Sequence, residues 1–103
     1  LMWRKVGKLS DIDEGKARLA QLNGKDIALF KISGHIYAFE NACCHRGGPL
    51  VEGYLEGMEV TCPWHAWAYD VKTGVCSTAP DIKQPVFQVK IDNGAIFVLV
   101  ATT

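Results

Sequence analysis

The chain has 103 residues, of which 49% are hydrophobic, and its eleven Lys and Arg residues balance its eleven Asp and Glu residues. This length predicts one domain over residues 1–103, and the charge balance argues against proteins that bind nucleic acid or membrane surfaces through a basic excess. No apolar run approaches the roughly 18–20 residues of a membrane helix, and the first residues lack the apolar segment of a secretory signal. We therefore expect no nucleic-acid partner, no membrane partner and a cytoplasmic location.

Short strands separated by turn signals occupy the first part of the chain. Lys16–Leu22 alternates up to Asn23-Gly24, Asp26–Ile32 is largely apolar up to Ser33-Gly34, and His35–Glu40 is rich in aromatic and β-branched residues. Asn-Gly between such segments is a strong hairpin signal. Short strands at this spacing predict an all-β sandwich or barrel.

The last part of the chain predicts a second hairpin. Val86–Ile91 alternates, Asn93-Gly94 supplies the turn, and Ala95–Val100 returns. Because side chains alternate across a strand, one set of positions faces the core, and we expect the odd-numbered residues to do so.

The middle of the chain has a different character. Glycine and proline are too dense there for long regular elements, although short strands are expected at 59–61 and 68–70. All four cysteines and two of the three histidines fall in this stretch. We interpret residues 41–85, approximately, as a loop-rich metal-binding subdomain inserted in a β scaffold made of 1–40 and 86–103.

Two Cys-His pairs carry the chemistry of this subdomain. Cys43 and His45 form a C-x-H pair, and Cys62 and His65 form a C-x-x-H pair after sixteen intervening residues. In a cytosolic protein, cysteines are more often metal ligands or thiols than disulfides. Two loops that each give one thiolate and one imidazole suit a two-iron site, with both thiolates on one iron and both imidazoles on the other.

A structural zinc site is the alternative interpretation, since zinc accepts two cysteines and two histidines. Its common spacing places the cysteines together and the histidines together, unlike the pattern here. We expect Cys44 and Cys76 to be small, buried or half-buried thiols outside the metal site, and His35 to be a turn or surface residue.

The two loop sequences, Cys43–Leu50 and Cys62–Trp67, resemble the signature of Rieske-type [2Fe–2S] ferredoxins, the low-potential kind associated with oxygenases or found in archaea. The resemblance extends over most of the chain. It implies the Rieske fold, an all-β arrangement of stacked antiparallel sheets or an incomplete barrel with a loop-rich cluster-binding subdomain. It also implies one [2Fe–2S] cluster per chain. The ligands implied are Cys43, His45, Cys62 and His65.

The resemblance further implies a monomeric, soluble one-electron carrier, not an enzyme, between a flavin-dependent reductase and a terminal oxygenase or other oxidoreductase. A Rieske oxygenase needs a second iron on two histidines and a carboxylate, and this chain has only His35 left for it. The alternatives are a small Rieske-like subunit of an assimilatory nitrite reductase and a redox-sensing or structural metal-binding module.

The chain departs from the respiratory Rieske proteins at several positions. Gly48 and Trp64 stand where those proteins have a disulfide, and Trp67 stands where they have a serine that donates to a sulfide. Tyr69 matches a tyrosine that donates to a ligand sulfur, and Ala66 replaces the more usual glycine. Since hydrogen bonds to sulfur raise the potential, we expect a value of roughly −150 to 0 mV, near the low end of the Rieske range.

Overall fold

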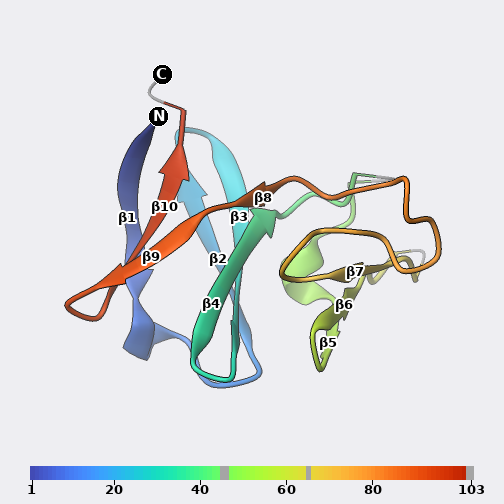
Figure 1. Cartoon of the computed structure of the whole chain (residues 1–103), viewed down its shortest axis with the longest axis horizontal. Helices are drawn as coiled ribbons and strands as arrows, with labels where there is room; N and C mark the ends of the chain where they lie inside the picture. Colours follow the sequence, from blue (N-terminus) through green and yellow to red (C-terminus); the bar gives the residue numbers. More distant parts are fainter. Residues whose placement is uncertain (45–46, 65, 102–103) are drawn as a thin grey trace.

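The computed structural model describes residues 1–44, 47–64 and 66–101, and its described elements are strands and two short 3₁₀ helices (Figure 1). In chain order the elements are β1 (Met2–Lys8), η1 (Leu9–Asp11), β2 (Ala17–Leu22), β3 (Lys25–Ile32), β4 (His35–Glu40), η2 (Leu50–Glu52), β5 (Tyr54–Glu56), β6 (Glu59–Thr61), β7 (Ala68–Asp70), β8 (Val86–Phe87), β9 (Val89–Asp92) and β10 (Ala95–Val100). In the described ranges, no helix is long and apolar enough to cross a membrane.

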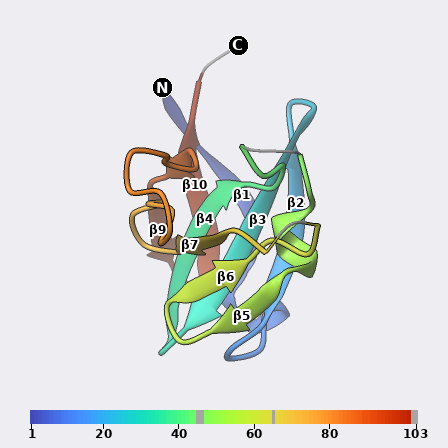
Figure 2. The ribbon, with the colours of Figure 1, turned by 90° about the vertical axis from the view of Figure 1, so that its right-hand side faces the viewer.

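The strands form three antiparallel sheets, in the orders β1-β10-β9, β2-β3-β4-β8 and β5-β6-β7. Figure 1 shows the β2–β3–β4 strands between β1, β9 and β10 on one side and β5–β7 on the other. In Figure 2 the β5–β7 sheet lies in front of β2–β4. The prediction of an all-β fold of stacked antiparallel sheets is confirmed. The division into a β scaffold and an inserted subdomain stays a prediction.

The central strand β3 is buried on both faces. Its Ile27 and Leu29 belong to a core shared with Ile96 and Val98 of β10. Its Ala28 and Phe30 face the other way, into a second core. That second core also contains Phe39 of β4. It is completed by side chains from the middle of the chain, namely Cys43, Leu50, Val60, Cys62, Tyr69, Val71 and Cys76. Three of the four cysteines therefore lie on the side of β3 that faces away from the strands at the chain ends.

The predicted hairpin at the end of the chain is present, but the predicted face of β10 is wrong. Ile96, Val98 and Val100 are buried, so the even-numbered residues of β10 face the core. The reason is the two-residue turn at 93–94, which pairs Val89 with Val98 and Ile91 with Ile96. Cross-strand partners share a face, so an odd position on β9 shares its face with an even position on β10.

Most predicted strands have the expected bounds, including 35–40, 59–61, 68–70 and 95–100. The predicted strand 86–91 is instead two strands in different sheets. β8 pairs with β4, whereas β9 pairs with β10, and Gln88 separates them. β1 and β5 were not predicted from the sequence.

Candidate metal centre

Cys43, which follows β4 after Asn41 and Ala42, begins a closed loop, here called the first cysteine loop (residues 43–48). The backbone N–H of Cys43 donates to the carbonyl of Gly48 over 2.8 Å, and the N–H of Gly47 donates back to the carbonyl of Cys43 over 2.7 Å. At the base of the loop, Asn41 accepts the N–H of Leu50 on its carbonyl and the N–H of Val51 on its side-chain Oδ1. The residues on both sides of the loop are therefore held together.

Cys62 begins the second cysteine loop (residues 62–67), which connects β6 to β7. The N–H of Cys62 donates to the carbonyl of Trp67 over 2.8 Å, and the N–H of Ala66 donates to the carbonyl of Cys62 over 3.1 Å. This is the hydrogen-bond pattern of the first cysteine loop at the same spacing. In both loops the fifth residue has a positive φ, +76° at Gly47 and +60° at Ala66. The two loops thus present their cysteines in equivalent local conformations.

The two cysteine loops contact each other at Gly48. A β-carbon added to Gly48 would lie 2.7 Å from Sγ of Cys62 and 3.1 Å from the Trp64 ring, so the first loop approaches as closely as a glycine permits. Cys43 and Cys62 are 3% and 1% exposed, which means that their sulfurs face the interior. Gly48 and Trp64, the positions that match the respiratory disulfide, are therefore neighbours in space.

Tyr69 of β7 places a polar group beside the first cysteine loop. Its hydroxyl lies 3.0 Å from Sγ of Cys43 and 3.6 Å from Sγ of Cys44. Burial raises the pKa of Tyr69 far above its ordinary value, and the contacts with the two thiols raise the pKa further. Both effects favour the protonated form of the hydroxyl.

The structure describes two of the four predicted ligands. Cys43 and Cys62 are brought into one core, whereas His45 and His65 lie outside the described residues. Cys76 is a fully buried thiol whose Sγ is 3.6 Å from Oγ1 of Thr78, which confirms the expectation that it is buried.

The other two residues singled out from the sequence lie at the surface. Cys44 is an exposed thiol at the start of the first cysteine loop, so the expectation that it is buried or half-buried is wrong: its side chain lies at the surface. His35 is exposed at the start of β4, as expected for a turn or surface residue.

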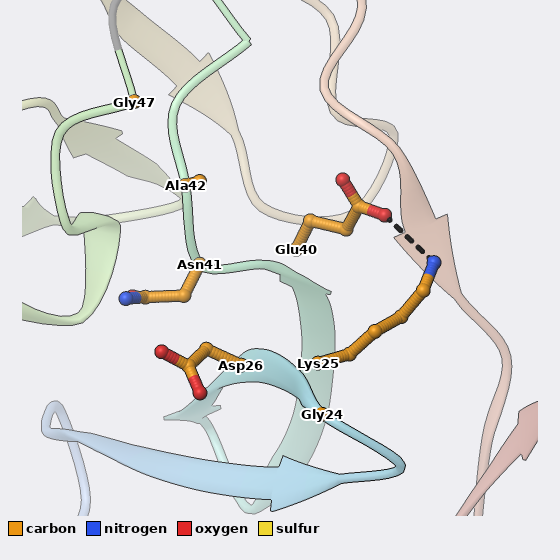
Figure 3. A pocket seen from close by; sticks show the side chains of 7 residues that line it. All are labelled: Gly24, Lys25, Asp26, Glu40, Asn41, Ala42 and Gly47. Carbon is orange, nitrogen blue, oxygen red and sulfur yellow. Dashed lines mark hydrogen bonds and ion pairs between the residues drawn. The ribbon is translucent and has the colours of Figure 1, made fainter.

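A hollow of about 330 Å³ lies beside the base of the first cysteine loop, lined there by Ala42 and Gly47 (Figure 3). Its charged rim includes an ion pair in which Nζ of Lys25 is 3.2 Å from Oε1 of Glu40. Because the lysine side chain is 61% exposed, this pair contributes about 0–1 kcal/mol. The hollow is a surface feature whose lysine and glutamate pair with each other.

Sequence reasoning missed two polar side chains that hold the first cysteine loop. Asn41 stands at the end of a predicted strand, where a polar residue is unremarkable, and Gln84 lies in a proline-containing segment. Gln84 hydrogen-bonds backbone groups 40 to 44 residues away in the chain. Contacts with backbone leave no residue-type pattern, so nothing in the sequence marks these two residues.

The family of the chain follows from comparison with known proteins. The Rieske [2Fe–2S] domain family matches residues 2–98, nearly the whole chain. The chain belongs to the Rieske family. As a Rieske protein it carries one [2Fe–2S] cluster, which confirms the predicted cofactor. The donor set of the described residues fits that cluster, because iron–sulfur clusters are held by cysteine thiolates and two buried cysteines stand in adjoining loops.

Relatives of this Rieske chain are ferredoxin components of dioxygenase systems. The ferredoxin component of the naphthalene 1,2-dioxygenase/salicylate 5-hydroxylase systems of Ralstonia sp. is 42% identical over 94 residues, which cover 88% of each protein. The ferredoxin component of the naphthalene 1,2-dioxygenase system of Pseudomonas putida is 40% identical over 92 residues, again 88% of each.

Solved structures of Rieske proteins share the fold. A chain in the complex of reduced oxygenase and oxidized ferredoxin in carbazole 1,9a-dioxygenase matches with a TM-score of 0.86 and 33% identity, over 93% of this chain and 91% of that one. The Sphingomonas yanoikuyae B1 ferredoxin matches with a TM-score of 0.88 over 97% of this chain and 100% of that one. Its identity is 20%, so this likeness bears on the fold alone.

Proposed function

We propose that Cys43, His45, Cys62 and His65 hold the [2Fe–2S] cluster, with the thiolates on one iron and the imidazoles on the other. The observation that carries this proposal is the equivalence of the two cysteine loops, which share one hydrogen-bond pattern and meet at Gly48. The two histidines are assigned from the sequence alone, in which they stand two residues after Cys43 and three residues after Cys62. A cluster that bridges the loops would make use of both pairs.

The chain is a one-electron carrier that delivers electrons to a terminal oxygenase, and it receives them from a reductase. Its relatives are named as ferredoxin components of dioxygenase systems, and a similar chain is found in complex with an oxygenase. When bound, the cluster would accept one electron from the reductase and release it to the oxygenase. After assignment of two histidines to the cluster, His35 is left, too few ligands for the second iron of an oxygenase. The protein is therefore a component of a multicomponent system and not its catalytic subunit.

The chain's own residues would protect the cluster on one side and expose it on the other. Cys43, Cys62 and Tyr69 are buried, which excludes water from the sulfur side and lowers the dielectric there. Trp64, between Cys62 and His65 in sequence, is 63% exposed. Aromatic side chains are enriched at protein interfaces, so we assign Trp64 to the contact with the redox partner. That contact is expected to bury less than about 1,200 Å², because a carrier must dissociate quickly.

We also assign the chain to the cytoplasm. Cys44 and Cys76 are thiols in the structure, and thiols persist in a reducing compartment.

The ligand assignment is tested with two matched cysteine variants. Cys62→Ala is expected to remove the iron and labile sulfide of the anaerobically purified protein. Cys76→Ala removes a thiol that is equally buried in the same core, and it is expected to keep both. Iron analysis and the EPR spectrum of the reduced protein measure the result. A Cys62→Ala protein with a full Rieske signal would overturn the assignment.

The role as an electron carrier is tested by measuring electron transfer after the reduced protein is mixed with an oxygenase. The reduced protein is combined in a stopped-flow instrument with the oxygenase of a naphthalene 1,2-dioxygenase system, and its reoxidation is followed in the visible spectrum. Trp64→Ala is expected to slow the transfer and to leave the EPR spectrum unchanged. Tyr54→Ala, which alters an exposed aromatic side chain on β5, serves as the control. Absence of any transfer from the wild-type protein to the oxygenase would contradict the proposed role.

A further inference from the structure

Gln84 is a fully buried polar residue whose side chain holds the backbone of the first cysteine loop. Its Oε1 accepts the N–H of Cys44 over 2.8 Å. Its Nε2 donates to the carbonyls of Glu40 over 2.7 Å and Ala42 over 2.8 Å. Glu40 and Ala42 follow each other closely where the chain leaves β4 (Figure 3). A buried amide is costly unless its hydrogen bonds are made, and this one makes three to a single short segment.

The backbone of Gln84 is in turn fixed to the segment that follows the second cysteine loop. Its N–H donates to the carbonyl of Gly74 over 2.8 Å, and the N–H of Gly74 donates to the carbonyl of Asp70, the last residue of β7. A β-carbon at Gly74 would lie 2.2 Å from the carbonyl oxygen of Gln84, so only glycine permits this approach. Gln84 therefore connects the strand that leaves the second cysteine loop with the start of the first.

We propose that Gln84 is a positioning residue for the cluster, acting through its three hydrogen bonds to the backbone of residues 40–44, where the first cysteine loop starts. This inference rests on the proposed ligand set, because Cys44 lies between Cys43 and His45 in the sequence. Residues that hydrogen-bond the surroundings of metal ligands orient those ligands, and their loss typically costs 10–100-fold in metal affinity. Gln84 holds the first cysteine loop at a fixed position relative to the second, and so sets the spacing of the two thiolates.

The test compares three variants of the holo-protein purified without oxygen. Gln84→Leu has a similar volume and removes all three hydrogen bonds. Gln84→Glu keeps the shape and the acceptor for Cys44, and replaces the amide group that donates to Glu40 and Ala42. Val98→Ala removes buried volume from the core on the other face of β3, and so lowers stability at a distance from the cysteine loops.

Three quantities are measured for each variant: the EPR spectrum of the reduced cluster, the reduction potential, and the rate of iron loss to a chelator. We expect both Gln84 variants to lose iron about tenfold faster than wild type and to show broadened EPR lines and a changed potential. Val98→Ala is expected to lower the melting temperature and to leave the EPR spectrum and potential unchanged. A purely structural role for Gln84 would make its variants behave like Val98→Ala.

Each outcome decides the proposal. If Gln84→Leu does not fold, the result for Gln84→Glu decides whether Gln84 positions the cluster, since this variant replaces a single NH₂ group with oxygen. Gln84 variants with the wild-type EPR spectrum, potential and rate of iron loss would overturn the role of Gln84 and leave the proposed function intact. A wild-type protein without iron or a Rieske EPR signal would overturn the proposed function, and the role of Gln84 with it.

Discussion

The hydroxyl oxygen of Tyr69 lies 3.0 Å from Sγ of Cys43, and both residues are buried. A cysteine that binds iron is a thiolate and has no hydrogen to give, so in the cluster-loaded protein the tyrosine would be the donor. Its pKa is raised by burial first and by the neighbouring thiols second, so the proton stays in place. Tyr69 is therefore placed to stabilise negative charge on the Cys43 sulfur.

Removal of this hydroxyl should lower the reduction potential. In Tyr69→Phe the sulfur loses a donor whose hydrogen bond strengthens when the cluster gains an electron. We expect a fall on the order of 60 mV, the one-electron equivalent of a tenfold change in the equilibrium constant. Potentiometry with EPR detection measures it. Tyr54→Phe is the control, since Tyr54 is 72% exposed, and an unchanged potential in Tyr69→Phe would contradict the role of the hydroxyl.

The absolute potential is a separate prediction. The chain has Trp67 in place of the serine donor and has no disulfide between positions 48 and 64, which are glycine and tryptophan. With fewer groups to stabilise the reduced cluster, the potential should lie at roughly −150 to 0 mV. Spectroelectrochemistry of the wild-type protein measures this value, and a clearly positive potential would show that other donors compensate.

Gly48 should not tolerate even one added methyl group. The β-carbon of Gly48→Ala would lie 2.7 Å from Sγ of Cys62, a buried side chain that would have to shift. We expect a loss of about 1–3 kcal/mol in the free energy of unfolding, together with a reduced iron content. Urea unfolding and iron analysis measure the two effects. Gly7→Ala, whose β-carbon would meet its nearest neighbour at 3.5 Å, should change neither, and equal behaviour of the two variants would refute the argument.

The equivalent positions of the two cysteine loops should respond in opposite directions. Ala66 adopts φ +60° at a cost of about 1–2 kcal/mol relative to glycine, so Ala66→Gly should stabilise the protein by up to that amount. Gly47 has φ +76° and open space around a β-carbon, so Gly47→Ala should destabilise it similarly. Melting temperatures of the holo-proteins measure both. A destabilised Ala66→Gly variant would contradict the conformational argument.

Stability should fall at acid pH through Glu14. Its carboxylate accepts the N–H groups of Gly34 and Ser33 at the turn between β3 and β4. These hydrogen bonds, with smaller contributions from the charges of Lys31 and His35, lower the pKa of Glu14 below 4.5. A carboxyl group with a lowered pKa in the folded state stabilises the fold above its unfolded pKa, and this contribution is lost as the pH falls through the folded value.

Glu14→Gln should therefore melt below wild type at neutral pH, with a difference that disappears in acid. Melting curves recorded from about pH 7 down to about pH 2 measure it. Asp81→Asn removes another exposed carboxylate and provides the control. A constant difference between Glu14→Gln and wild type at every pH would mean that the charge of Glu14 is not involved.

Local turn chemistry explains which parts of the fold were predictable. Asn23-Gly24 and Asn93-Gly94 have the positive φ values that tight hairpins require, and both hairpins form where the sequence predicts them. The buried face of β10 was not predictable from alternation, because it depends on which residues the turn pairs across the hairpin. β1 was missed because it is defined by its pairing with β10, at the other end of the chain.

The candidate site divides in the same way. Its two Cys-His pairs can be read directly from spacing, and Ala66, where the family usually has glycine, indeed adopts a conformation that glycine favours. The residues that hold the two cysteine loops in place cannot be predicted from spacing. Gln84 acts on carbonyl and amide groups that every residue possesses, so the choice of Glu40, Ala42 and Cys44 as partners depends on the fold and not on residue type.

The double burial of β3 limits how this chain can change its length during evolution. Loops tolerate insertions, but one residue added within β3 would rotate the side chains that follow it to the opposite side. The side chain of Phe30 would then point away from the core that contains the cysteines and toward β10, while Leu29 would occupy the former position of Phe30. Both interiors would receive side chains of the wrong shape at once. We therefore expect related sequences to vary in length at the turns on either side of β3 and to keep its eight residues without gaps.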